Sequence, residues 1–221
     1  GTSPSDLARW SFVAADPFGR FDVKDGQAFW KGQKIAGDAL DALREKFSTF
    51  SLTRENETLP FLSGAIGFIS YEMGKTFEII PEMPNSKPND LDLSFGFYDV
   101  VLAHDLKDHK SYLISSGFPA LDEQRRLARA EERLHVFQER LAQAPRKTIP
   151  NDPITNWTSN FTKESYEQAV KDIIEAILRG DIFQANLSQR FHAKRPMNFD
   201  PLTFYLQLRA RSPAPFGAYL A

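Results

Sequence analysis

The chain has 221 residues, enough to bury the core of one large domain or of two small ones. Its 27 basic and 29 acidic residues nearly balance, so the charge indicates neither a nucleic-acid-binding protein nor one that binds an anionic membrane. The absence of cysteine excludes disulfides, thiolate metal sites and a cysteine nucleophile. No apolar run reaches the ~20 residues that span a membrane. From both observations we expect a cytoplasmic protein.

The first part of the chain predicts short antiparallel strands. Residues 9–14 are expected to form a strand that ends at the turn sequence Asp16-Pro17. Residues 18–23 and 27–30 flank Asp25-Gly26, a dipeptide typical of a type I′ hairpin. A further turn at Lys31-Gly32 leads into residues 33–35, and these turns predict three short antiparallel strands.

A glycine-rich apolar segment, residues 59–74, follows a helix that Asp38 is expected to cap. Gly64, Gly67 and Gly74 interrupt it, and a glycine in a strand allows another stretch of backbone to approach closely. Two interpretations are open: close packing within a sheet, or a loop that cradles a phosphate. The second lacks both a following helix and the Gly-Lys-Ser/Thr sequence.

The middle of the chain predicts a long strand, its hairpin partner and a helix. Residues 92–104 carry apolar side chains at both parities, which is typical of a strand buried on both faces, and residues 110–115 are the expected partner. Residues 121–142 have helical periodicity, with Glu, Arg and Gln on a solvated outer face. The side chains expected to point inward are Leu127, Ala130, Leu134, Phe137 and Leu141. Residues 144–156, rich in proline, predict a linker.

The chain is organised around residues 166–191, where a helix is expected to lead directly into a strand. The helix is expected to begin after Thr162, to bury an apolar stripe and to end at Gly180. From Phe183 the period changes to two, which places polar side chains together on one face of the expected strand. These polar residues are Gln184, Asn186, Ser188 and Arg190. A further helix is expected from Asp200-Pro201, and an unfinished strand over residues 216–220.

One part of this region, residues 180–191, reads GDIFQANLSQRF. It resembles the signature of the chorismate-using enzymes, which convert chorismate to anthranilate, aminodeoxychorismate or isochorismate. Asn186-Leu187 followed by Gln189-Arg190-Phe191 is most similar to the aminodeoxychorismate synthase component I branch. The segments 9–17, 59–74 and 212–220 resemble further motifs of the family, with Trp10, Ser63, Glu72 and Ser212 as departures from them.

The resemblance implies a fold. It is α+β, with four layers α/β/β/α that contain two packed, largely antiparallel sheets, and it would be incomplete in this chain. Residues 1–150 would be the N-terminal α+β region of the family, and residues 151–221 the truncated start of its chorismate-binding domain. The periodicity of the chain, taken by itself, predicts only a mixed α+β protein with antiparallel sheets.

The resemblance also implies a reaction, the conversion of chorismate and ammonia to 4-amino-4-deoxychorismate for p-aminobenzoate and folate synthesis. A partner glutamine amidotransferase would supply the ammonia, and Mg²⁺ held by carboxylates would bind the substrate. The family motifs that carry the metal ligands, the general acid and the lysine nucleophile do not occur here. We therefore expect no catalytic residue and no metal ligand in this chain, and no activity from it alone. The alternatives are anthranilate synthase component I, or a non-catalytic module that binds an amino acid or a partner protein.

Two groups of residues are candidates for binding. The family has a tryptophan site, whose motifs fall here on Leu7, Ala8, Arg9, Trp10, Ala214, Pro215 and Phe216. Alternatively these segments are plain core strands, or the indole of Trp10 fills the site itself. The polar face of residues 184–190 is the second candidate, as the lining of a cleft. Arg190 could bind a carboxylate through two parallel hydrogen bonds, or pair with an acidic residue across two sheets.

Overall fold

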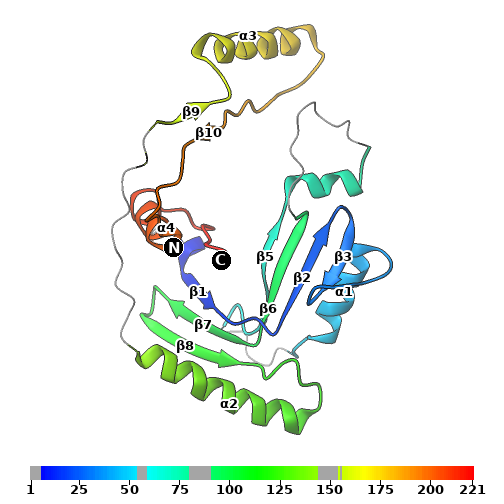
Figure 1. The fold of residues 1–221 in the computed structure, drawn as a ribbon, viewed down its shortest axis with the longest axis vertical. Coiled ribbons are helices and arrows are strands. Elements are labelled where there is room, and N and C mark those ends of the chain that lie inside the picture. Colours follow the sequence, from blue (N-terminus) through cyan, green and yellow to red (C-terminus); the bar gives the residue numbers. More distant parts are fainter. Residues whose placement is uncertain (1–5, 54–58, 80–90, 144–153, 155) are drawn as a thin grey trace. The chain divides into compact units, whose positions relative to one another are not determined.

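The computed structural model describes residues 6–53, 59–79, 91–143, 154 and 156–221. The chain divides into two compact units: Gly1–Arg146 together with Ser212–Ala221, and Lys147–Arg211. The first unit contains two antiparallel sheets, each with a helix packed against it (Figure 1). The expected α+β class with antiparallel sheets is confirmed. No helix of the described residues is long and apolar enough to cross a membrane.

The first sheet has three strands in the order β1 (Trp10–Ala14), β7 (Val100–Asp105), β8 (Lys110–Ser115). A short 3-10 helix, Asp6–Ala8, precedes it. Trp10 lies opposite Asp105, and Ala103 lies opposite Tyr112, so these residues share one face of the sheet. Helix α2 (Glu123–Ala142) runs along β7 and β8 (Figure 1).

The second sheet has five strands in the order β4 (Gln33–Lys34), β3 (Gln27–Trp30), β2 (Gly19–Lys24), β6 (Leu93–Tyr98), β5 (Gly64–Ile69). Asp25 and Gly26 both have positive φ, 50° and 72°, which confirms the expected type I′ hairpin. Helix α1 (Ala39–Thr49) covers one face, and Asp38 accepts from two amides of its first turn, as expected. The core between them consists of Phe21, Val23, Ala28, Ala39, Ala42, Leu43, Leu93 and Phe97.

The glycine-rich segment belongs to this sheet, which supports the packing interpretation over the phosphate loop. Gly67 pairs with Phe95, and a Cβ atom at position 67 would lie 1.8 Å from the carbonyl oxygen of Ser94. Only glycine allows β5 to approach β6 this closely. A 3-10 helix, Tyr71–Thr76, follows the strand.

The expected long strand over residues 92–104 is wrong in one respect. It is two strands, β6 and β7, which belong to different sheets and are separated by Asp99 alone. Asp99 is fully buried, and its carboxylate accepts hydrogen bonds from two arginines of α2. The chain leaves one sheet for the other at this residue, and the two arginines supply the hydrogen-bond partners that a buried carboxylate needs.

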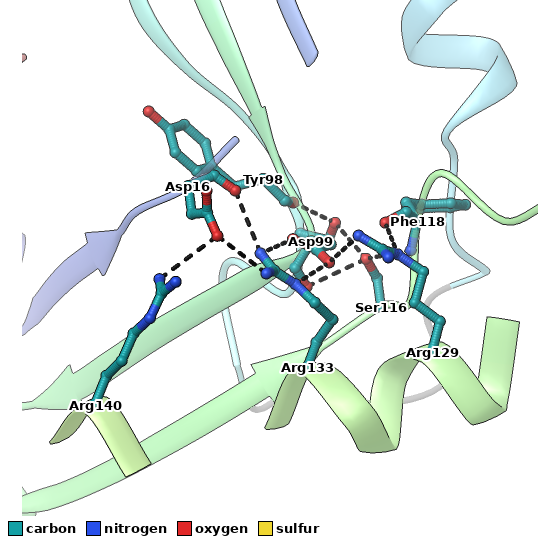
Figure 2. A network of polar contacts seen from close by, with 9 residues as sticks. Asp16, Tyr98, Asp99, Ser116, Phe118, Arg129, Arg133 and Arg140 are labelled. Carbon is teal, nitrogen blue, oxygen red and sulfur yellow. Dashed lines mark hydrogen bonds and ion pairs between the residues drawn. The ribbon is translucent and has the colours of Figure 1, made fainter. Parts of the chain in front are cut away.

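The predicted inner face of the 121–142 helix is also partly wrong. Leu127 and Leu141 are 60% and 55% exposed, whereas Ala130, Leu134 and Phe137 are half-buried as expected. The arginines at 129 and 133, which we assigned to the solvated face, extend toward the sheets instead (Figure 2). They do so because Asp99 requires positive charge within hydrogen-bonding reach.

The second unit contains β9 (Thr158–Ser159), α3 (Lys163–Arg179), β10 (Phe191–His192) and α4 (Pro201–Arg211). The ends of α3 are those expected: Thr162 forms a capping box with Ser165, and Gly180 ends the helix at φ 81°. The prediction of α4 from Pro201 is confirmed as well.

Two strand predictions in the C-terminal part of the chain are wrong. Residues 183–190 form no strand, and only Phe191–His192 pairs, with β9. Residues 216–220 form no strand either. Alternating polarity is not sufficient for a strand, which also requires a neighbouring backbone to pair with. The expected linker, residues 144–156, lies almost entirely outside the described residues.

Candidate functional site

An aromatic cluster marks the face of the three-stranded sheet that carries Trp10. The ring centroids of Trp10 and Phe12 lie 6.3 Å apart and nearly parallel, and Tyr112 of β8 lies 6.3 Å from Trp10. Phe61, from the segment that leads into β5, meets Phe12 edge-on at 5.7 Å. Rings in these arrangements attract one another through their quadrupoles as well as by burial. The cluster offers flat apolar surface of the kind that binds another ring.

Arg9 forms the charged end of this cluster. Its Nε and Nη2 atoms donate to the carboxylate of Asp105 at 3.0 and 2.6 Å, and its guanidinium lies 5.4 Å from the centre of the Trp10 ring. The hydrogen bonds from Arg9, joined by the amides of Lys107 and Asp108, lower the pKa of Asp105 well below its usual value. Arg9 therefore donates its paired N–H groups to Asp105, and these donors are not available to the carboxylate of a ligand.

The residues predicted to bind tryptophan do not share one buried surface. Ala8 is 1% exposed and Trp10 is half-buried, but Leu7 is 68% exposed. At the other end of the chain Phe216 is 82% exposed, Ala214 is exposed and Pro215 is half-buried. Both segments belong to the same compact unit. The structure thus supports a packed role for Ala8 and Trp10, and leaves Leu7 and Phe216 turned to solvent.

The residues predicted to line a cleft lie in the second unit, outside any strand. Gln184, Asn186, Ser188 and Arg190 are all exposed. The amide of Arg190 donates to Oδ1 of Asn160 at 2.6 Å, so its backbone is anchored to the segment that precedes α3. Its guanidinium has no acidic partner within the part of the chain that the structure describes, which leaves the predicted ion pair across two sheets without support.

Among the residues that the structure describes, no group of three or more His, Cys, Asp or Glu side chains converges in a way that could hold a metal ion. The residues described here therefore do not fit a magnesium site, and no catalytic step through Mg²⁺ can be assigned to them.

The partners of the predicted site residues were not identified from the sequence. Phe12, Phe61, Asp105 and Tyr112 complete the surroundings of Trp10, yet they come from four separate segments: β1, the segment before β5, β7 and β8. A signal was present for one of the buried ion pairs. Asp99 stands in the middle of the apolar run FGFYDVVLA, and an aspartate in such a place requires a cationic partner elsewhere in the chain.

Comparisons with known proteins agree on one family. The family model described as chorismate binding enzyme matches residues 3–221. Aminodeoxychorismate synthase component 1 of Escherichia coli (strain K12) is 30% identical over 227 aligned positions, which cover 100% of this chain and 46% of that protein. Anthranilate synthase component 1 of Thermus thermophilus is 30% identical over 220 positions, covering 96% of this chain and 45% of that protein.

A solved structure gives the same result for the fold. The crystal structure of anthranilate synthase component I from Streptococcus pneumoniae TIGR4 matches with a TM-score of 0.76 and 29% identity, over 100% of this chain and 49% of that one. The layered α+β fold expected from the sequence is therefore confirmed. The chain spans about half the length of the relatives that it matches.

Proposed function

Because the chain belongs to the family of chorismate-binding enzymes, we propose that it is the N-terminal half of an aminodeoxychorismate synthase component I. Such an enzyme would convert chorismate and ammonia to 4-amino-4-deoxychorismate, a precursor of p-aminobenzoate and folate. The observation that carries the proposal is the alignment of the whole chain with the Escherichia coli aminodeoxychorismate synthase component 1. The sequence from Asn186 to Phe191 favours the same branch.

A second candidate is anthranilate synthase component I. It is favoured by the Thermus thermophilus relative, whose identity to this chain is the same 30%, and by the Streptococcus pneumoniae structure. Both candidates use the same substrate and differ in the position at which it is aminated. A non-catalytic binding module remains a third candidate only for a gene that encodes no more than this chain.

The part of the reaction that we assign to this chain is structural. We propose that residues other than those described here supply the general acid, the nucleophile and the ligands of Mg²⁺, which would neutralise a carboxylate of chorismate. We further propose that a glutamine amidotransferase delivers the ammonia and that the protein works in the cytoplasm.

We also propose that tryptophan binds at the Trp10 end of the three-stranded sheet, along residues 7–10 and 214–216. The support is the aromatic surface of Trp10, Phe12 and Tyr112, which suits an indole ring. The carboxylate of a bound amino acid would need a donor other than the paired nitrogens that Arg9 gives to Asp105. Binding would be measured by calorimetric titration of the chain with tryptophan, with phenylalanine as the control.

The test of the reaction uses the longest polypeptide that the gene encodes, incubated with chorismate, ammonium and Mg²⁺. Chromatography of the products is expected to give 4-amino-4-deoxychorismate. Anthranilate as the main product would favour the second candidate, and no consumption of chorismate would overturn both. The 221-residue chain tested alone is expected to show no turnover, and turnover by it would refute our placement of the catalytic groups elsewhere.

A further inference from the structure

Within the residues that the structure describes, the chain passes between the two sheets at two points that lie beside α2. At the first, residues 15–18 lead from β1 in the three-stranded sheet to β2 in the five-stranded sheet. At the second, Asp99 alone separates β6 from β7. Asp16, in the first crossing, has φ 60°, in the left-handed region that aspartate tolerates better than most residues with a side chain. Its carboxylate and its carbonyl oxygen both accept hydrogen bonds from α2, which hold this crossing in place.

Arg133 of α2 contacts both crossings at once. Its Nε and Nη2 atoms donate to the two carboxylate oxygens of Asp99 at 2.8 and 3.0 Å. Its Nη1 atom donates to the carboxylate of Asp16 at 3.1 Å, and Nη2 also donates to the carbonyl oxygen of Asp16 at 3.3 Å. The side chain of Arg133 is 14% exposed and that of Asp99 is 0% exposed. Figure 2 shows the guanidinium between the two aspartates.

Neighbouring residues reinforce the same two points. Arg129, one helical turn earlier, reaches Asp99 at 3.4 Å and the carbonyl oxygen of Phe118 at 3.0 Å, and Arg140 reaches Asp16 at 3.5 Å (Figure 2). The amide of Ser116 donates to the carbonyl oxygen of Asp99 at 2.9 Å. These contacts join α2, the loop after β8 and both crossings into one network.

Stability alone is a poor explanation for this network. A buried ion pair contributes little net stability, because the desolvation of its charges offsets their attraction. An apolar pair of similar volume would hold α2 on the sheet equally well. Apolar contacts do not depend on direction, whereas hydrogen bonds do. A planar guanidinium with several fixed donors can therefore hold two separate groups at a defined distance and angle.

We propose that Arg133 is a clamp that sets the orientation of the three-stranded sheet relative to the five-stranded sheet. The edge-on contact between Phe12 of β1 and Phe61, just before β5, spans the same two sheets, so the clamp also sets the shape of the aromatic cluster. The inference goes beyond the proposed function and holds whichever reaction the protein takes part in. It makes Arg133 a positioning residue, with no direct role in binding.

The test measures the distance between the sheets. Because the chain has no cysteine, two introduced cysteines can carry the only spin labels. Lys24 of β2 and Lys110 of β8 are exposed and lie in different sheets, so Lys24→Cys with Lys110→Cys gives the label pair that spans the two sheets. Lys24→Cys with Gln33→Cys in β4 places both labels in the five-stranded sheet and serves as the reference pair. Double electron–electron resonance then gives a distance distribution for each pair.

Arg133→Met is expected to broaden and shift the distribution between the sheets while the reference pair keeps its distribution. Arg133→Lys retains the charge that Asp99 needs but loses the forked donors, so it should fold and show the same broadening to a smaller extent. Arg125→Met, an exposed arginine in the first turn of α2, is the matched control and should change neither pair.

Each outcome decides the proposal. An unchanged distribution between the sheets in Arg133→Lys, with the protein folded by circular dichroism, would overturn it even if Arg133→Met fails to fold. Equal broadening of both label pairs would also overturn it, because the network would then hold the fold in general and not the orientation of the sheets. Broadening confined to the pair between the sheets supports the clamp.

Discussion

The close approach of β5 and β6 makes Gly67→Ala the most informative stability variant. A Cβ atom there would lie 1.8 Å from the carbonyl oxygen of Ser94 and 2.7 Å from the Cα atom of Phe95, far inside the 3.4 Å at which ordinary contact begins. Overpacked sites usually cost about 1–3 kcal/mol. The obstructing atoms here are backbone atoms of a neighbouring strand, which cannot rotate away. We therefore expect a loss of about 3 kcal/mol or more, a large share of the roughly 5–15 kcal/mol that stabilises a typical domain.

Urea denaturation followed by circular dichroism would measure this loss. Gly217→Ala is the matched control, because its Cβ would meet its nearest neighbour at 3.5 Å and its φ is not positive, so we expect a change within about 0.5 kcal/mol. Gly180→Ala should fall between them at about 1 kcal/mol, since its cost comes from the left-handed conformation at φ 81° and not from a clash. A Gly67→Ala protein as stable as Gly217→Ala would refute the described approach of the two strands.

Three further predictions concern charge, capping and product. Arg9 lowers the pKa of Asp105 in the folded protein, so this pair stabilises the fold fully only above the unfolded pKa of an aspartate, about 4. Its contribution to the free energy of unfolding is lost as the pH falls further. Asp105→Asn should therefore make the free energy of unfolding, measured by urea titration at several pH values, fall less steeply in acid. Thr162→Ala removes the N-cap of α3 and should cost about 1 kcal/mol, seen as faster hydrogen exchange in the first turn of that helix; unchanged exchange would contradict the capping box. If the proposed function holds, Asn186→Val should not change the main product of the full-length enzyme to anthranilate, because the family motifs that carry the general acid and the nucleophile do not occur in the sequence around Asn186. Anthranilate as the main product in chromatography would contradict this placement of the active site.

The elements that local chemistry determines were predictable from the sequence. The hairpin at Asp25-Gly26 requires positive φ at two adjacent positions, and few dipeptides tolerate this. Helix α3 begins at Thr162 and ends at Gly180 because a hydroxyl cap and a left-handed glycine act within one turn of the helix. In each case the deciding atoms lie within a few residues of one another along the chain.

The errors all concern partners that are distant in the sequence. Asp99 interrupts an apolar run that would otherwise continue as one strand, and its partner Arg133 lies 34 residues further along the chain. The prediction that Arg133 lies on the outer face of α2 was wrong for the same reason, because no residue close to Arg133 in the sequence indicates that it contacts a buried carboxylate. Residues 183–190 have the alternation of a strand without a described neighbour to pair with. The candidate site was affected likewise, because Arg9 and Asp105 are 96 residues apart.

The single residue between β6 and β7 also limits how the chain can change in length. In a strand, successive side chains point to opposite faces of the sheet. Because only Asp99 separates β6 from β7, the face to which each side chain of β6 points determines the face to which each side chain of β7 points. An insertion or deletion of one residue there would reverse the phase and turn Val101 and Ala103, both fully buried, toward the opposite face of their sheet. A change of two residues would restore the phase but would carry Asp99 away from Arg133. This connection therefore tolerates substitution of its neighbours far better than any change in its length.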